Sequence, residues 1–238
     1  MALSREWLER ARTLVGGQLL VQEEELEPYS HDEYATDEFR RRPQAVARPG
    51  SEEEVARLVG FCAESGVPVT ARGAGTGLSA GCLPAEGGIV LSLERLNRVL
   101  DADKANHTIT VQAGVSLRQL YGEVQAMGLY FPPHPGDEGA FVGGAVATNA
   151  GGARAVKYGT IRRFVLGLQV VLADGSLVEL GGKLIKSSTG YNLLSLMIGS
   201  EGTLGVITRV TLSLLPPAAS VETLVLPFLE VRQAVEAV

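Results

Sequence analysis

The amino-acid sequence predicts an α+β fold with two lobes, the first covering about residues 1–103 and the second about residues 104–217. Two observations predict it. Residues 44–71 follow a strand–helix–strand pattern, whereas residues 108–215 contain mostly apolar strands and one amphipathic helix. A hydrophobic fraction of 45% with 20% charged residues is typical of a folded globular protein and argues against a disordered chain.

In the first lobe, residues 4–15 are predicted to form an amphipathic helix that ends at Gly16-Gly17. A short strand at residues 44–48 leads to Ser51, which caps a second helix. Glu54 completes a capping box, and Gly66 ends this helix. Strands are predicted at 67–71 and 88–93, and a strand–helix–strand unit of this kind makes a right-handed crossover.

In the second lobe, a strand at 108–113 is followed by a helix that opens at Ser116 and closes at Gly128. Strands at 166–172 and 177–180 flank an Ala-Asp-Gly-Ser turn and predict a hairpin. A last strand occupies 206–215. Residues 218–238 resemble a strand and the start of a helix, which predicts the beginning of a truncated C-terminal cap or substrate domain.

Charge and composition exclude several classes of protein. A net charge of −6 argues against a nucleic-acid-binding surface, because such a surface needs a basic face. No apolar stretch approaches the roughly 18 residues of a membrane-spanning helix, and residues 1–12 lack the apolar core of a signal peptide. We therefore expect a cytoplasmic protein, with any membrane contact made through a partner. Cys62 and Cys82 have no metal-binding or redox spacing, and we expect no metal site.

The first candidate for a binding site is the glycine-rich segment Arg72-Gly-Ala-Gly-Thr-Gly-Leu-Ser-Ala-Gly81. It contains the G-x-G-x-x-A form of the dinucleotide fingerprint, but Pro84 follows where that fingerprint needs a helix. Alternating glycines in a loop between strands form a nest of N–H groups that holds a diphosphate. Thr76 and Ser79 add hydroxyl donors, and Arg72 adds a positive charge at the mouth. The alternative is a plain glycine-rich surface turn.

Two further segments are rich in small residues. Pro132 to Gly152 contains a proline-rich turn and then the nearly uniform run of small residues from 143 to 153. Such residues let backbone approach a flat ring system, although close packing between two elements also favours them. Gly199-Ser-Glu-Gly-Thr-Leu-Gly205 leads into an apolar strand, which alone is typical of an ordinary strand-entry turn. All three segments fall where a two-lobed protein has its cleft.

The ordered set Arg72-Gly-Ala-Gly-Thr-Gly, Val142-Gly-Gly…Asn149-Ala-Gly-Gly, Tyr158-Gly and Gly199-Ser-Glu-Gly-Thr-Leu-Gly-Val-Ile resembles the FAD-binding PCMH-type domain. This is the fold of the vanillyl-alcohol oxidase family, and the match is closest to its branch of glycolate oxidase and D-lactate dehydrogenase flavoproteins. The resemblance covers about residues 25–217. No single motif decides it, whereas the ordered set is specific.

The resemblance implies FAD as the cofactor and a role for each matching position. Residues 72–79, namely Arg72, Gly73, Ala74, Gly75, Thr76, Gly77, Leu78 and Ser79, are expected to cradle the pyrophosphate. Asp137, Val142, Gly143 and Gly144 are expected near the ribityl chain and the flavin, and Asn149, Gly151 and Gly152 continue that contact. Glu201, Val206 and Ile207 are expected on the adenine side or at the seam between the lobes.

Some relatives attach FAD through a histidine or a cysteine. Here no histidine lies beside residues 72–79, Cys82 follows that loop, and His134 stands where such relatives carry Asp. We therefore expect non-covalent FAD, with His134 as a surface residue.

The resemblance also implies a reaction, in which FAD takes a hydride from a small 2-hydroxy acid and passes electrons to an acceptor or a partner subunit. In such relatives the base, the substrate arginine and the metal-ligating histidines lie in a cap domain, so no catalytic residue is assigned within residues 1–238. Two alternatives stay open: another flavoenzyme on the same domain, and a flavin-binding or electron-transfer subunit without turnover.

Overall fold

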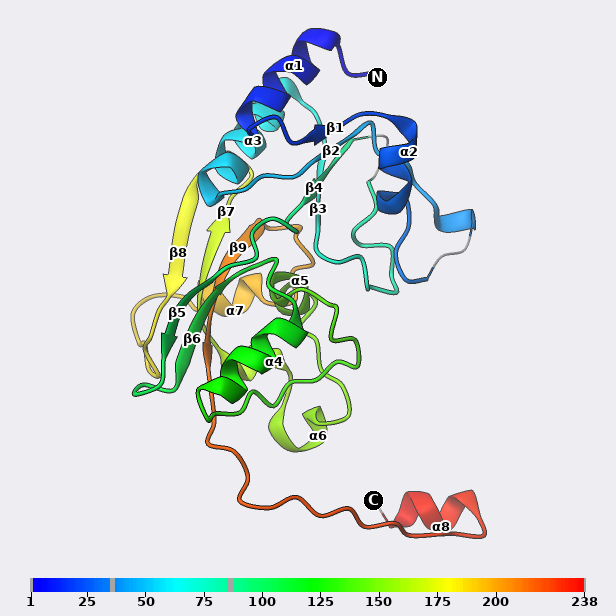
Figure 1. Ribbon diagram of the computed structural model, residues 1–238, viewed down its shortest axis with the longest axis vertical. Helices are drawn as coiled ribbons and strands as arrows, with labels where there is room; N and C mark the ends of the chain where they lie inside the picture. Colours follow the sequence, from blue (N-terminus) through cyan, green and yellow to red (C-terminus); the bar gives the residue numbers. More distant parts are fainter. Residues whose placement is uncertain (1, 35–36, 85–87, 238) are drawn as a thin grey trace.

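The computed structural model describes residues 2–34, 37–84 and 88–237, which form two β-sheets with helices packed against them (Figure 1). The first sheet has the strand order β1-β2-β4-β3 and the second β5-β6-β9-β7-β8. The strands are β1 (Leu19–Leu20), β2 (Ala45–Ala47), β3 (Val69–Arg72), β4 (Ile89–Ser92), β5 (Val99–Asp103), β6 (Thr108–Gln112), β7 (Val165–Val171), β8 (Leu177–Gly181) and β9 (Val206–Ser213). The α-helices are α1 (Arg5–Leu14), α2 (Glu23–Leu26), α3 (Glu52–Ser65), α4 (Leu117–Ala126), α5 (Val142–Ala147), α6 (Ala155–Tyr158), α7 (Leu193–Met197) and α8 (Val231–Glu236).

Helices α1 and α3 cover the first sheet, and the sequence signals at the ends of α3 are confirmed. The Ser51 hydroxyl accepts a hydrogen bond from the Glu54 N–H at 3.2 Å, and Gly66 ends the helix in the left-handed conformation with φ +66°. The Glu54 carboxylate accepts from the Gly50 N–H at 2.7 Å. In the predicted capping box, the Glu54 carboxylate would accept from the N–H of Ser51. It accepts instead from the N–H of the preceding residue, so this half of the box is shifted by one position.

The predicted strand–helix–strand unit is present as β2, α3 and β3, but its two strands are not neighbours. Both pair in parallel with β4, which lies between them, and β1 adds an antiparallel edge beside β2. All three residues of β2 and all four of β4 are buried, as expected of central strands covered on both faces.

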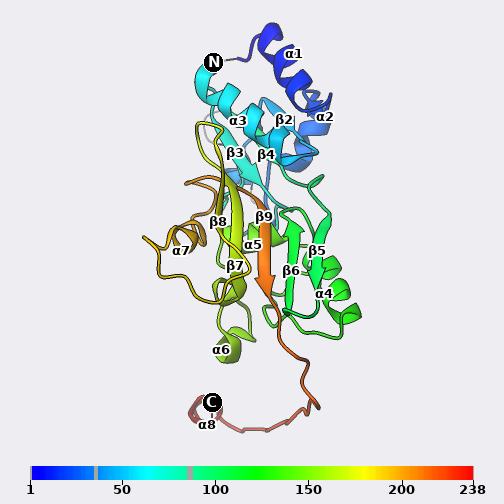
Figure 2. The same cartoon turned by 90° about the vertical axis from the view of Figure 1, so that its left-hand side faces the viewer.

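The second sheet is antiparallel throughout, with its strands side by side in Figure 2. The predicted hairpin is confirmed as β7 and β8. Helix α4 begins after Ser116, whose hydroxyl accepts from the Gln119 N–H, and buries Leu117, Leu120 and Val124 against the sheet. This gives the lobe its own hydrophobic core.

The two sheets divide between Ser92 and Val99, before the boundary predicted near residue 103. The difference arises from β5, which the sequence pattern did not indicate as a strand. Its three central residues are exposed, so it has little apolar alternation, and pairing with β6 defines it instead.

The C-terminal residues extend away from the two lobes and end in α8 (Figure 1). The strand predicted within residues 218–238 is not formed in the described part of this stretch, and residues 221–230 are exposed. An isolated apolar stretch makes no sheet without a partner strand, which explains the wrong prediction. No helix in the described ranges is both long enough and apolar enough to span a bilayer.

Candidate cofactor site

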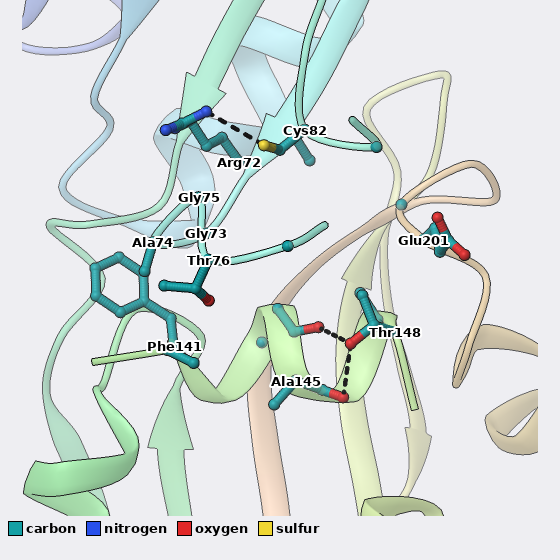
Figure 3. Close-up of a pocket in the computed structure, with 18 of the residues that line it drawn as sticks. Arg72, Gly73, Ala74, Gly75, Thr76, Cys82, Phe141, Ala145, Thr148 and Glu201 are labelled. Atoms are coloured by element: carbon teal, nitrogen blue, oxygen red, sulfur yellow. Dashed lines mark hydrogen bonds between the residues drawn. The ribbon is translucent and has the colours of Figure 1, made fainter. Parts of the chain in front are cut away.

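A cavity of about 470 Å³ lies between the two lobes, and its walls come from all three segments that the sequence singled out (Figure 3). The end of β3 and the loop after it contribute residues 71–79, α5 and the turn before it contribute the opposite wall, and residues 201–207 close a further side. A cavity of this volume between two lobes is typical of a site for a large ligand.

The loop from Gly73 to Ser79 presents backbone N–H groups with no protein partner. Across the described residues, none of these seven N–H groups has a hydrogen-bond acceptor. The loop is held at its ends, because the Ala80 N–H donates to the Asp32 carboxylate at 2.8 Å and the Glu33 N–H donates to the Gly77 carbonyl at 3.2 Å. A row of free N–H groups on a braced loop fits an anionic group such as a diphosphate.

Gly75 is the position in this loop that no other residue can fill without strain. Its φ is +79°, and a Cβ there would lie 2.1 Å from Nη2 of Arg72. A Cβ on Gly77 would instead meet nothing within 4 Å. The two glycines thus differ: Gly75 is needed by the protein itself, whereas Gly77 keeps the space in front of the loop free.

Arg72 does not stand at the mouth of the site as the sequence suggested. Its side chain is buried, and its guanidinium donates to the Pro28 carbonyl at 3.1 Å and to the His31 carbonyl at 2.8 Å. The guanidinium also lies over the Tyr29 ring. Arg72 therefore ties the loop to residues 28–31, because backbone carbonyls there need a donor that the irregular segment does not supply.

Asp32 is a lining residue that the sequence did not indicate. It is buried, and its carboxylate accepts from the N–H groups of Ala80 and Tyr34. Residues 28–43 have neither periodicity nor a motif, so the sequence gives no local signal for this residue. Only the three-dimensional fold brings Asp32 under the end of the glycine-rich loop.

Helix α5 forms the wall opposite the loop, and its glycines allow two close approaches. A Cβ on Gly143 would lie 2.5 Å from Cβ of Ala113, and a Cβ on Gly73 would lie 3.6 Å from Cα of Gly144. Gly143 and Gly144 line the cavity, whereas Val142 is fully buried beneath it. Phe141, Ala145 and Thr148, labelled in Figure 3, also line the cavity; they lie within the segment that the sequence indicated but were given no cofactor contact of their own.

Within the segment Asn149–Gly152, Ala150 lines the cavity, whereas Asn149, Gly151 and Gly152 do not, although the segment is as rich in small residues as the loop. The Asn149 side-chain oxygen accepts from the Thr160 hydroxyl at 2.8 Å and from the Arg162 N–H at 3.3 Å. Gly152 has φ +100°, and a Cβ there would lie 2.0 Å from the His134 carbonyl oxygen. These contacts account for Asn149 and Gly152 by packing within the protein. The cofactor contact expected of Asn149, Gly151 and Gly152 stays a prediction.

The third wall begins at Glu201, which has a left-handed backbone with φ +53°. Its N–H donates to the Ala147 carbonyl at 2.8 Å, which fixes residues 201–207 against α5. Val206 and Ile207 are buried and line the cavity at the start of β9. Glu201 lies across the cavity from the glycine-rich loop in Figure 3.

The charges of the lining are mostly acidic. Among the described lining residues Arg72 is the one cation, whereas Asp32, Asp137 and Glu201 supply three carboxylates. Asp137 accepts from the Gly139 N–H at 2.7 Å. Since Arg72 is engaged with carbonyls, the donors left for a diphosphate are the N–H groups of residues 73–79. The lining residues fit FAD, with main-chain N–H groups as donors to its diphosphate in place of cationic side chains.

The two side chains considered for covalent attachment are held by protein contacts. The Cys82 thiol lines the cavity and lies 3.2 Å from Nη1 of Arg72, and burial raises its pKa, with Arg72 acting in the opposite direction. His134 is half-buried outside the lining, with Nδ1 3.2 Å from the Tyr121 hydroxyl. A protonated thiol is a poor nucleophile, which supports non-covalent binding.

Comparison with known proteins identifies the same fold. The family model described as FAD binding domain matches residues 43–181. The chain is 45% identical over 223 residues to a protein of Anaerostipes hadrus named D-lactate dehydrogenase, covering 94% of this chain and 47% of that protein. It is 40% identical over 211 residues to the glycolate oxidase subunit GlcD of Bacillus subtilis, covering 88% of this chain and 44% of that protein.

A solved structure of alkyldihydroxyacetonephosphate synthase superposes with a TM-score of 0.80 at 23% identity, over 92% of this chain and 42% of the other. These matches confirm the predicted two-lobed FAD-binding fold and FAD as the cofactor. The chain spans about half the length of the curated relatives it matches.

Proposed function

Because the chain belongs to the family of FAD binding domains, we propose that it is the FAD-binding portion of an oxidoreductase that oxidises a small 2-hydroxy acid such as D-lactate or glycolate. One observation carries the cofactor site: seven consecutive residues that line a cavity between two lobes have backbone N–H groups with no acceptor among the described residues. The names of the relatives at 45% and 40% identity support the choice of substrate class.

We propose that the loop Gly73–Ser79 holds the FAD diphosphate by its N–H groups, with Thr76 and Ser79 adding hydroxyl donors. Arg72 acts indirectly, by bracing the loop against residues 28–31. Gly143, Gly144 and Asp137 lie on the opposite side, where small residues leave room for the flavin half. Glu201, Val206 and Ile207 close the remaining wall.

Bound FAD supplies the hydride acceptor for oxidation of the hydroxyl-bearing carbon. The residues of this chain bind it, orient it and exclude water from one side of it. The apolar lining from Ala71, Leu93, Phe141 and Ala145 serves the last of these tasks. We further propose that residues 218–238 begin a second domain and that the substrate base and carboxylate ligand lie beyond residue 238.

The mode of attachment is open to a direct test. We propose non-covalent FAD, supported by the contact of Cys82 with Arg72 and by the raised pKa of its thiol. Acid precipitation of the yellow protein then releases the colour into the supernatant. A yellow pellet would contradict this and direct attention to Cys82 and His134.

The proposed reaction is tested on a chain that includes the proposed second domain, by adding FAD and measuring reduction of an artificial electron acceptor with D-lactate or glycolate. Turnover, or bleaching of bound flavin by either acid, supports the proposal. If that protein binds FAD but is reduced by neither acid, the result supports the alternative of a flavin-binding or electron-transfer subunit.

We also propose a cytoplasmic location, with an electron acceptor or partner subunit that provides any contact with a membrane. The acidic net charge of −6 disfavours direct adsorption to an anionic membrane surface. Fractionation of cells into cytosol and membranes, before and after a high-salt wash, distinguishes a free protein from one held by a partner.

A further inference from the structure

A row of polar side chains crosses the second sheet at the junction between the lobes. Gln112 at the end of β6 is opposite Arg209 of β9, Arg209 is opposite Gln169 of β7, and Gln169 is opposite Glu179 of β8. Gln112 is completely buried. A buried amide is costly unless all its groups are hydrogen-bonded, so its partners define what it does.

The partners of Gln112 come from both lobes. Its Nε2 donates to Oε1 of Glu52, in the first turn of α3, at 3.0 Å. Its Oε1 accepts from the backbone N–H of Arg98 at 3.0 Å and from Nε of Arg98 at 3.3 Å. One side chain therefore joins the helix of the first lobe, the connection between the two sheets and the central strands of the second lobe.

The backbone that follows Gln112 reaches the cavity wall directly. The carbonyls of Ala113 and Val115 accept hydrogen bonds from the N–H groups of Gly143 and Val142, at 2.8 and 2.9 Å. These are the first two residues of α5. The Gly114 N–H donates to the Leu96 carbonyl at 2.7 Å, and a Cβ on Gly114 would lie 2.1 Å from the Leu93 carbonyl oxygen.

The chain between Gln112 and α5 has little conformational freedom, because the backbone of residues 113–115 contacts the backbone of other segments directly. Ala113 packs within the hydrophobic core of the first lobe. Neither Gln112 nor Glu52 lines the cavity, whereas Gly143, Gly144 and Thr148 of the α5 segment do. Any shift of residue 112 relative to α3 therefore moves α5 relative to the glycine-rich loop.

We propose that Gln112 and Glu52 form a tie between the lobes that positions α5 opposite the loop Gly73–Ser79 and so sets the width of the cofactor cavity. Both are positioning residues that act through α5. The effect on FAD rests on the proposed function, whereas the effect on α5 does not. A looser cavity lowers the fraction of molecules that are competent to bind, which raises the apparent Kd in proportion.

The matched variants are Gln112→Leu and Glu52→Leu, which break the tie, and Glu52→Gln, which keeps an acceptor of the same shape for Nε2 of Gln112. Val124→Ala serves as the control for lost stability, since Val124 is buried in α4 against the second core and does not line the cavity. If Gln112→Leu does not fold, Glu52→Leu tests the same hydrogen bond from the other side of the pair.

The first measurement is amide hydrogen exchange in the protein without added FAD. We expect faster exchange at Val142 and Gly143 in Gln112→Leu and Glu52→Leu than in Val124→Ala of similar melting temperature, and protection as in the wild type in Glu52→Gln. Unchanged protection at these two amides in both leucine variants would overturn the proposal. This result does not depend on whether the chain binds FAD.

The second measurement is an FAD titration followed by flavin fluorescence. The leucine variants are expected to bind FAD about tenfold more weakly, as when about a tenth of the molecules keep the competent arrangement. Val124→Ala and Glu52→Gln are expected to keep the Kd of the wild type. Equal Kd values for all variants, together with equal losses of stability, would contradict the proposal. They would show that the hydrogen bond between Gln112 and Glu52 stabilises the fold without setting the width of the cavity. A wild type that takes up no FAD would instead contradict the proposed function.

Discussion

The loop Gly73–Ser79 and the segment Asn149–Gly152 are both runs of small residues, and the sequence predicts both as cofactor ligands. The structure separates them. Among the described residues, the N–H groups of the loop have no acceptor, and the loop residues line the cavity. In the other segment Gly152 packs against the His134 carbonyl, Asn149 accepts hydrogen bonds from Thr160 and Arg162, and Ala150 alone lines the cavity.

The comparison teaches that glycine content does not identify a ligand site by itself. A glycine serves the protein when a Cβ would strike another part of the chain, as at Gly152. It serves a ligand when a Cβ would enter an open cavity, as at Gly77. Hydrogen bonds distinguish the two segments only in part. The N–H groups of Asn149 and Ala150 donate to the carbonyls of Val146 and Ala145, whereas those of Gly151 and Gly152 have no acceptor among the described residues.

The largest effect is expected from Gly75→Asp. The new side chain would meet the Arg72 guanidinium, demand φ +79° of a residue with a Cβ, and set a carboxylate beside the diphosphate. We expect the Kd for FAD to rise about a hundredfold, or about 3 kcal/mol. Isothermal titration calorimetry measures it, with circular dichroism to verify the fold. A folded variant with the Kd of the wild type would remove the loop from the site.

Gly152→Ala should act on stability and not on the cofactor. A Cβ 2.0 Å from the His134 carbonyl forces the two backbones apart, so we expect the free energy of unfolding to fall by about 2 kcal/mol. Urea denaturation measures this. If the variant keeps its stability but binds FAD weakly, Gly152 belongs with the loop and the comparison fails.

Gly77→Ala should show the opposite pattern. Apart from the two neighbouring residues, no atom of the described part of the chain lies within 4 Å of the new Cβ, so the melting temperature is expected to match the wild type. A methyl group in front of the N–H row should keep the diphosphate away and weaken binding about tenfold. An FAD titration beside a thermal melt gives both numbers. Unchanged affinity would place the diphosphate elsewhere.

Asn149→Ala is a smaller perturbation of the packed segment. It removes the acceptor for the Thr160 hydroxyl and the Arg162 N–H and puts alanine at φ +51°, which should cost about 1–2 kcal/mol of stability. Asn149→Gly separates the two causes, because it restores the backbone freedom alone. FAD affinity that falls in both variants would contradict a packing role.

The smallest effect concerns salt. Because Arg72 is bound to carbonyls and the other charged residues in the described lining are carboxylates, added salt has no cation–phosphate attraction to screen. Between 50 and 300 mM NaCl we expect the Kd to change by less than about twofold. A steep loss of affinity with salt would mean that a cation contacts the diphosphate.

Local signals predicted the helix ends well. Ser51 and Gly66 act within a few residues of themselves, so α3 could be placed from the sequence. Strand β5 could not, because an exposed edge strand depends on the pairing with β6 and not on its own alternation. Helix α5 was missed for a similar reason, since a run of small residues has no periodicity.

At the site, the sequence indicated the segments but not the roles of the side chains. The loop at 72–79 was placed correctly, because glycine spacing is a local property. Asp32 and the bonds of Arg72 join residues 40 or more positions apart, and no local pattern encodes such pairs. The role of Gln112 as a contact between lobes depends likewise on a partner 60 residues away.

The central claim, that backbone N–H groups of residues 73–79 hold the cofactor, is tested most directly by amide hydrogen exchange with and without saturating FAD. We predict strong new protection at Gly73–Ser79 and little change at Asn149–Gly152. Protection at Asn149–Gly152 with none at Gly73–Ser79 would contradict the claim and reverse the roles of the two segments.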